Sequence, residues 1–135
     1  MPRIQKIKFL IIHCSDTPDK QKVTADDIHN MHLGFGWDGI GYHKIICRDG
    51  TIENGRPEYW VGAHAYGVNE ESLGVCLIGR NSFTKKQYDS LEKVLLKWKK
   101  VYLNSKILGH CEAIKTSKTC PNFDVSKFLK EKELL

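Results

Sequence analysis

The sequence lacks any hydrophobic run that approaches the roughly 20 residues needed to cross a bilayer. Basic residues precede an apolar run in the N-terminal segment MPRIQKIKFLII, as they do in secretion signals. That run is shorter than an export signal requires, breaks at once into HCSDTPDK and offers no small-residue cleavage site. We therefore predict that the segment is a first strand, that the chain is synthesised in the cytoplasm without a signal peptide, and that it has no membrane partner.

The sequence also lacks a disulfide framework. Its five cysteines are odd in number, scattered, and include no CxxC pair, which argues against a disulfide-stapled scaffold and favours reduced thiols. Repeats, low-complexity segments and linkers are absent as well. A chain of 135 residues can bury a core without staples, so we expect residues 1–135 to form a single domain.

Acidic residues are fewer than basic ones, and the formal net charge is +5. An excess of this sign favours polyanionic partners such as nucleic acid, acidic polysaccharide or anionic cell-wall polymer, although solubility alone would also account for it. Several lysines fall in segment 84–103, but Asp89 and Glu92 interrupt them. We interpret this segment as a solvated face and expect no binding to nucleic acid.

The apolar runs and turn signals that are present predict a mixed sheet covered by helices. Asp49-Gly50 lies between two strand-like runs, which is typical of a hairpin. Segment 84–103 has apolar residues at helical spacing, and two shorter helices are expected to begin after Thr24 and Asp124. Continuous apolar runs predict buried strands at 7–13, 72–80 and 105–110. The predicted fold class is α/β, with a central mixed sheet flanked by helices.

Two of the predicted strands end in histidine, at His13 and His110, and Cys120 lies on the loop that follows the second. Neighbouring strands would bring the two imidazoles together, and a thiolate would complete three ligands for zinc. Three protein ligands with a fourth position left to water are typical of a catalytic site, where zinc makes hydroxide available near neutral pH. The alternative is that both histidines bond to backbone groups and that Cys120 is a small buried apolar residue.

Four motifs in order resemble the zinc-dependent N-acetylmuramoyl-L-alanine amidases: FLIIHCSDT, GYHKIICRDGTIENGR, VGAHAYGVNEESLGVCLIG and SKTCPNFD. The motifs lie between residues 9 and 124, and the resemblance covers residues 7 to about 130. It is greatest to the short phage lysozymes of the T-odd coliphage type, which are amidases. The peptidoglycan recognition proteins, some of which bind without cutting, share the fold. The resemblance implies a zinc enzyme with this amidase fold.

Carried over position by position, the resemblance implies a role for each matching residue. His13, His110 and Cys120 match the zinc ligands. Tyr42 matches a catalytic tyrosine that would bond the reacting oxygens or relay a proton. Lys118 matches a catalytic lysine that would stabilise the oxyanion, although Lys115 lies close enough to compete for that role because the preceding loop is longer than in the phage proteins.

Four further residues are candidate substrate contacts. His64 matches a histidine near the pocket of similar proteins, with a structural hydrogen bond as the equal alternative. Trp37, Trp60 and Asn69 lie in loop-like stretches and could line a groove for sugar and peptide, with core packing as the alternative for the aromatic residues.

Other histidines and cysteines have simpler interpretations. Strand alternation should turn His43 away from Tyr42 and into the core, and should turn Cys14 away from the metal. His29 and His32 are expected to be solvated or to cap their short helix.

The resemblance implies hydrolysis of the amide bond between the lactyl group of N-acetylmuramic acid and L-alanine in peptidoglycan. We expect a monomeric phage or prophage endolysin that acts on the cell wall and is released by a separate pore. The alternatives are a non-catalytic peptidoglycan-binding module and a cytosolic amidase that recycles muropeptides.

Overall fold

The computed structural model describes residues 2–4, 6–114 and 119–134. Its elements follow the predicted order with small changes at their ends. In chain order they are β1 (Phe9–Cys14), α1 (Ala25–Gly34), β2 (Lys44–Ile46), β3 (Ile52–Asn54), the 3₁₀ helix η1 (Asn69–Glu71), β4 (Ser72–Leu77), α2 (Lys85–Val101), β5 (Lys106–Gly109), α3 (His110–Ala113) and α4 (Val125–Glu131).

The strands form one mixed sheet in the order β3-β2-β4-β1-β5, which confirms the predicted class. Strand β1 lies between β4 and β5 and is parallel to both. Strand β2 is parallel to β4 and antiparallel to β3. Parallel strands in the middle of a sheet are buried on both faces, which explains the continuous apolar runs in the sequence.

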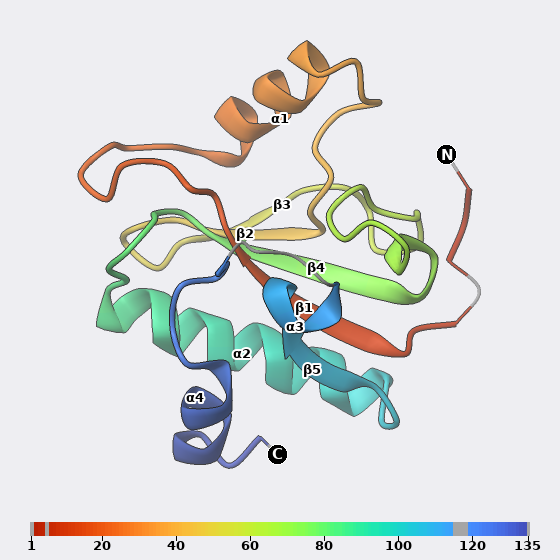
Figure 1. The fold of residues 1–135 in the computed structure, drawn as a ribbon, viewed down its shortest axis with the longest axis vertical. Helices are drawn as coiled ribbons and strands as arrows, with labels where there is room; N and C mark the ends of the chain where they lie inside the picture. The colour runs from red at the N-terminus through yellow and green to blue at the C-terminus, as the bar shows by residue number, and fades with distance from the viewer. Residues whose placement is uncertain (1, 5, 115–118, 135) are drawn as a thin grey trace.

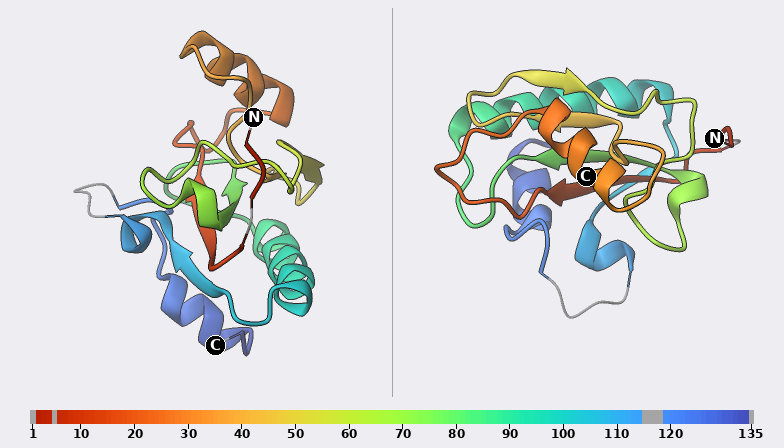
Figure 2. Two further views of the ribbon diagram at one scale, coloured as in Figure 1. Left: turned by 90° about the vertical axis from the view of Figure 1, so that its right-hand side faces the viewer. Right: turned by 90° about the horizontal axis from the view of Figure 1, so that it is seen from above.

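Helices cover both faces of this sheet. Helices α2 and α4 lie together on one side and α1 lies on the other, as Figure 1 and the side views of Figure 2 show. The larger core packs Leu10 and Ile12 of β1 against α2 and α4. Because side chains alternate along a strand, Ile11 and His13 face the opposite side, toward α1. The functional side chains are therefore on the face that α2 and α4 leave free.

Local hydrogen bonds define the ends of the helices as the sequence predicts. Thr24 and Asp27 form a capping box before α1, and Thr84 and Gln87 form one before α2. The Asp124 side chain accepts a hydrogen bond from the N–H of Lys127 and caps α4. These bonds satisfy N–H groups that a helix leaves free at its first turn.

The predicted hairpin joins β2 to β3. The N–H of Cys47 donates to the carbonyl of Thr51 across the turn, at 2.9 Å. Gly50 has φ +88°, which glycine adopts without strain. The Asp49 carboxylate accepts from the N–H of Thr51 at 2.9 Å and closes the turn.

The last predicted strand ends one residue early. β5 stops at Gly109, and His110 is the first residue of the short helix α3. The carboxylate of Glu112 accepts a hydrogen bond from the N–H of Gly109 at 2.8 Å, which starts the helical turn there. No helix in the described part of the chain is long and apolar enough to cross a membrane.

Candidate metal centre

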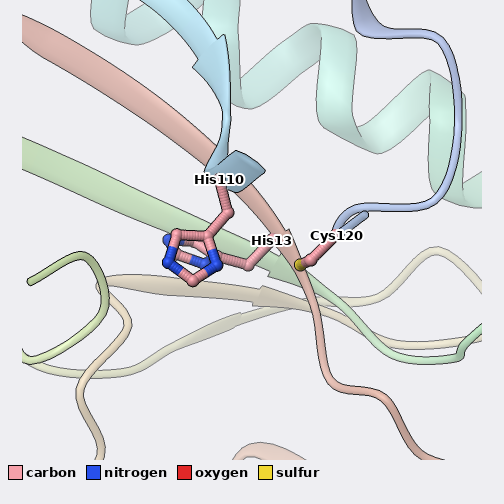
Figure 3. Close-up of side chains that lie close together, drawn as sticks. All are labelled: His13, His110 and Cys120. Carbon is pink, nitrogen blue, oxygen red and sulfur yellow. The ribbon is translucent and has the colours of Figure 1, made fainter. Parts of the chain in front are cut away.

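Three side chains from distant parts of the sequence meet at one edge of the sheet. His13 is on β1, His110 begins α3 and Cys120 lies on the loop before α4. Each offers one ligand atom, and these atoms all lie within 4.8 Å of one another. Figure 3 shows the two imidazole rings side by side, with the sulfur of Cys120 directed toward them. The predicted ligand set is thus brought together in space.

Strand register accounts for the approach of the two histidines. Ile12 of β1 pairs with Gly109 of β5 in parallel register, so the next residues, His13 and His110, lie next to each other at the carboxyl ends of these strands. Their ring centroids are 4.5 Å apart. The carboxyl ends of parallel strands are where functional side chains gather in open α/β sheets.

Backbone hydrogen bonds tie Cys120 to both ligand segments. Its sulfur accepts from the N–H of Cys14 at 3.1 Å, immediately after His13. Its carbonyl accepts from the N–H of Cys111 at 3.0 Å, immediately after His110. The loop that carries the thiol is therefore held against β1 and α3, the two elements that carry the imidazoles.

The donor set suits a borderline-soft divalent cation. Two imidazole nitrogens and one thiolate sulfur are common zinc ligands, and three of them leave a fourth position open. Burial has the largest effect on the pKa of His13 and lowers it, and the neighbouring imidazoles of His64 and His110 lower it further. The ring is therefore neutral and has a lone pair to offer. The neighbouring Cys14 thiol and burial raise the pKa of Cys120, so a bound cation would have to displace its proton.

The ligand group lies in a cavity of about 740 Å³. Of the predicted site residues, Trp37, Tyr42, His64 and Asn69 line it together with the three ligands. Tyr66, which is 90% exposed, also lines it and was not singled out from the sequence. A loop tyrosine without periodic neighbours gives no signal by which sequence analysis could find it.

Tyr42 lies close to the metal ligands and is largely shielded from water. Its ring centroid is 5.0 Å from that of His13. Burial raises the pKa of its phenol well above the usual value. The hydroxyl therefore stays protonated near neutral pH and can donate a hydrogen bond.

His64 and Asn69 make internal hydrogen bonds within the cavity wall. Nδ1 of His64 is 2.8 Å from Nε2 of His13, and Nε2 of His64 is 3.3 Å from the Ser72 hydroxyl. The side-chain oxygen of Asn69 accepts from the N–H groups of His64 and Ala65, both at 2.8 Å. Both residues thus hold the site in shape.

Trp60 is the described site residue whose predicted place differs from the structure. Of the described residues, Trp60 does not line this cavity; the guanidinium of Arg3 lies 5.6 Å above its ring, and its carbonyl bonds to the ring of His43 at 2.8 Å. Lys118 and Lys115 fall outside the described residues.

Three of the simpler interpretations can also be compared with the structure. His43 is buried and bonds to the N–H of Gly74, which confirms its core position. The expectation that His32 is solvated or capping is wrong, because its ring is buried and accepts from the N–H of Gly41 at 2.9 Å. The expectation that Cys14 turns away from the site is wrong too, because β1 ends at Cys14 and this residue lines the same cavity as His13 and Cys120.

Comparison with known proteins gives a consistent set of matches. The family model described as N-acetylmuramoyl-L-alanine amidase matches residues 3–123. The endolysin of Escherichia phage T7 is 38% identical over 134 residues, covering 93% of this chain and 87% of the phage protein.

Solved structures agree with the sequence matches. The endolysin N-acetylmuramoyl-L-alanine amidase LysCS from Clostridium intestinale superposes with a TM-score of 0.87 at 29% identity, covering 100% of this chain and 90% of that chain. Drosophila PGRP-LB superposes with a TM-score of 0.77 at 31% identity, covering 89% and 78% of the two chains.

Proposed function

The chain belongs to the N-acetylmuramoyl-L-alanine amidase family, and from that premise we propose that it uses zinc to cut the bond between the lactyl group of N-acetylmuramic acid and L-alanine. It is an amidase of the phage endolysin type, and its substrate is peptidoglycan. The observation that carries the zinc assignment is the convergence of His13, His110 and Cys120, whose ligand atoms lie within 4.8 Å of one another.

The three ligands would hold the ion at the bottom of the cavity. When bound, zinc polarises the scissile carbonyl and supplies an acidified water. His13 is neutral because burial lowers its pKa, so its lone pair is available over the physiological pH range. The N–H of Cys14, which points at the sulfur of Cys120, would stabilise that sulfur as a thiolate.

Tyr42 would act as a hydrogen-bond donor to the reacting oxygens. Its raised pKa makes it a poor general base and keeps its proton available for donation. A donor aimed at a developing oxyanion in a site with little water stabilises the transition state more than it would in bulk water. Lys118, by its resemblance to the family lysine, is proposed as a second source of positive charge for the same oxyanion.

The open part of the cavity would receive the sugar and the stem peptide. Trp37 is 43% exposed and Tyr66 is 90% exposed, so both offer aromatic faces to a substrate. His64 and Asn69 line the same cavity. The net charge of +5 suits an acidic cell-wall substrate.

A defined muropeptide tests this function directly. The protein is incubated with N-acetylmuramoyl-pentapeptide, and the products are identified by mass spectrometry. We expect a free peptide that begins with L-alanine, and we expect a zinc chelator to stop its release. An intact muropeptide that remains bound to zinc-loaded protein would instead support a binding-only module, and a cut at any other bond would contradict the proposed reaction.

A further inference from the structure

We propose that His64 and Ser72 are positioning residues that fix the tautomer of His13 and so direct its Nδ1 lone pair toward the metal site. The inference rests on the proposed zinc function for the identity of the ion. It follows from a chain of four hydrogen-bonding groups, in which each group limits the protonation of the next.

This series of hydrogen bonds begins at the carbonyl of Val68, which can only accept a hydrogen bond. The hydroxyl oxygen of Ser72 lies 2.7 Å from the carbonyl oxygen of Val68. A carbonyl carries no hydrogen, so the Ser72 proton must lie between the two oxygens. Any other arrangement would place two oxygens at this distance with no proton to join them.

Ser72 must therefore accept from its other partner. Nε2 of His64 lies 3.3 Å from the same hydroxyl oxygen. Since the only hydroxyl proton already points at Val68, the proton of this second bond must belong to Nε2 of His64. The ring of His64 is buried, and its two hydrogen-bond partners are a hydroxyl and an imidazole and not a carboxylate, so it carries one ring proton. Its Nδ1 is consequently an acceptor.

The last link reaches the metal ligand. Nδ1 of His64 lies 2.8 Å from Nε2 of His13. Because Nδ1 accepts, Nε2 of His13 must donate. The neutral His13 ring then has its lone pair on Nδ1, the only ring nitrogen that remains available as a metal ligand.

The groups around His64 hold these hydrogen-bonded side chains in place. His13, His64 and Ser72 are all buried. A Cβ atom at Gly74 would lie 2.6 Å from Nδ1 of His64, so the absence of a side chain there makes room for the ring. The backbone N–H of His64 donates to Asn69 at 2.8 Å, which fixes the loop from which the ring projects.

This arrangement has a direct consequence for metal affinity. Partners that bond the second nitrogen of a ligand histidine fix its tautomer and orientation, and their loss costs about 10- to 100-fold in metal affinity. His64 would therefore contribute to zinc binding through His13, without touching the ion.

Nitrogen NMR on metal-free, ¹⁵N-histidine-labelled wild-type protein tests the tautomer without any substitution. We expect Nε2 of His13 to be protonated and Nδ1 to be unprotonated, and we expect the same pattern for His64. After addition of ¹¹³Cd²⁺, coupling should appear at Nδ1 of His13. A proton on Nδ1 of His13, or cadmium coupling at its Nε2, would overturn the proposal.

Substitutions test the contribution to affinity, measured by competition between the protein and a chromophoric zinc chelator. His64→Leu removes the acceptor and should weaken zinc binding about 10- to 100-fold. His64→Asn places an amide oxygen near the position of Nδ1 and should restore most of that affinity. His32→Leu is the matched control, because it removes another buried imidazole of the same cavity that bonds to Gly41 and not to His13; its zinc affinity should match the wild type.

A double substitution tests whether Ser72 acts through His64. Ser72→Ala should weaken zinc binding in the wild-type background and should have no further effect in the His64→Leu background. Equal zinc affinity of His64→Leu and wild type would overturn the inference and leave the proposed function intact. Wild-type protein that binds no zinc would instead contradict the proposed function, whereas the tautomers measured without metal would still stand.

Discussion

Cys120 is the one proposed ligand that lies in a loop. Its place depends on two backbone hydrogen bonds, from Cys14 to its sulfur and from Cys111 to its carbonyl. The two histidines were predictable as candidates because each ends an apolar run. Cys120 was a candidate because it follows His110 in a loop; no spacing rule supported it, and the resemblance to the family motif strengthened the prediction. The bond between His64 and His13 joins residues 51 apart in sequence, so no local pattern could reveal it.

Cys120→Ser should abolish stoichiometric zinc binding. A serine hydroxyl is a much poorer zinc ligand than a thiolate. We therefore expect zinc affinity to fall by more than the roughly 100-fold that follows the loss of a hydrogen-bond partner of a ligand. Cys111→Ser is the matched control, since the backbone N–H of Cys111 makes its bond to the described part of the same loop and the substitution keeps that N–H. Metal analysis after dialysis measures both. Full zinc content in Cys120→Ser would refute the ligand assignment.

Tyr42→Phe should lower kcat about 10²- to 10³-fold and leave KM and zinc content near their wild-type values. Loss of one hydrogen-bond donor to a developing oxyanion has an effect of this size. Steady-state kinetics on a soluble muropeptide, with zinc content measured in parallel, provides the comparison. A rise in KM with unchanged kcat would show that Tyr42 binds substrate in its ground state and does not act in the transition state.

At the scale of elements, the helix starts and the hairpin turn could be predicted because they depend on residues close together in the sequence. The helix starts predicted after Thr24 and Asp124 and the turn at Asp49-Gly50 are all present. The sequence did not reveal that β1 lies between β4 and β5, because strand order depends on long-range packing. The burial of His32 was missed, although its spacing from Ala25 and Ile28 on α1 places all three on one helix face.

Thr84→Ala should lower the free energy of unfolding by about 1 kcal/mol. The Thr84 hydroxyl accepts from the N–H of Gln87 and donates to the carbonyl of Arg48, so its loss frees the start of α2 from the hairpin. Urea unfolding measures the change, with Ser126→Ala on the exposed side of α4 as a control expected to stay within about 0.5 kcal/mol. Equal stability of Thr84→Ala and wild type would contradict the role of this cap.

At the scale of the whole molecule, the larger core on one face of the sheet leaves the other face for polar groups. That face buries several neutral imidazoles, among them His13, His43 and His64. Burial lowers the pKa of His43 to about 4. The unfolded chain therefore binds protons that the folded chain does not bind between about pH 6.5 and 4, and folding is favoured as the pH rises through this range. The contribution of His43 to the free energy of unfolding is fully present above about pH 6.5.

The zinc-free protein should consequently lose stability between pH 7 and pH 5. For His43 alone the loss should be about 2 kcal/mol, which corresponds to about 1.5 pH units at about 1.4 kcal/mol per unit. Urea unfolding of the wild type and of His43→Gln, both in the presence of a chelator, isolates the contribution of His43 to the pH dependence of stability. The pH dependence should be smaller in the variant by about that amount, and an unchanged dependence would show that His43 is not the residue that titrates.

X-ray absorption at the zinc edge, on protein that has been loaded with zinc and dialysed, tests the central claim most directly. The account predicts one zinc per chain, with one sulfur at about 2.3 Å and two imidazole nitrogens at about 2.0–2.1 Å. A coordination shell without sulfur, or full amidase activity in protein free of metal, would contradict it.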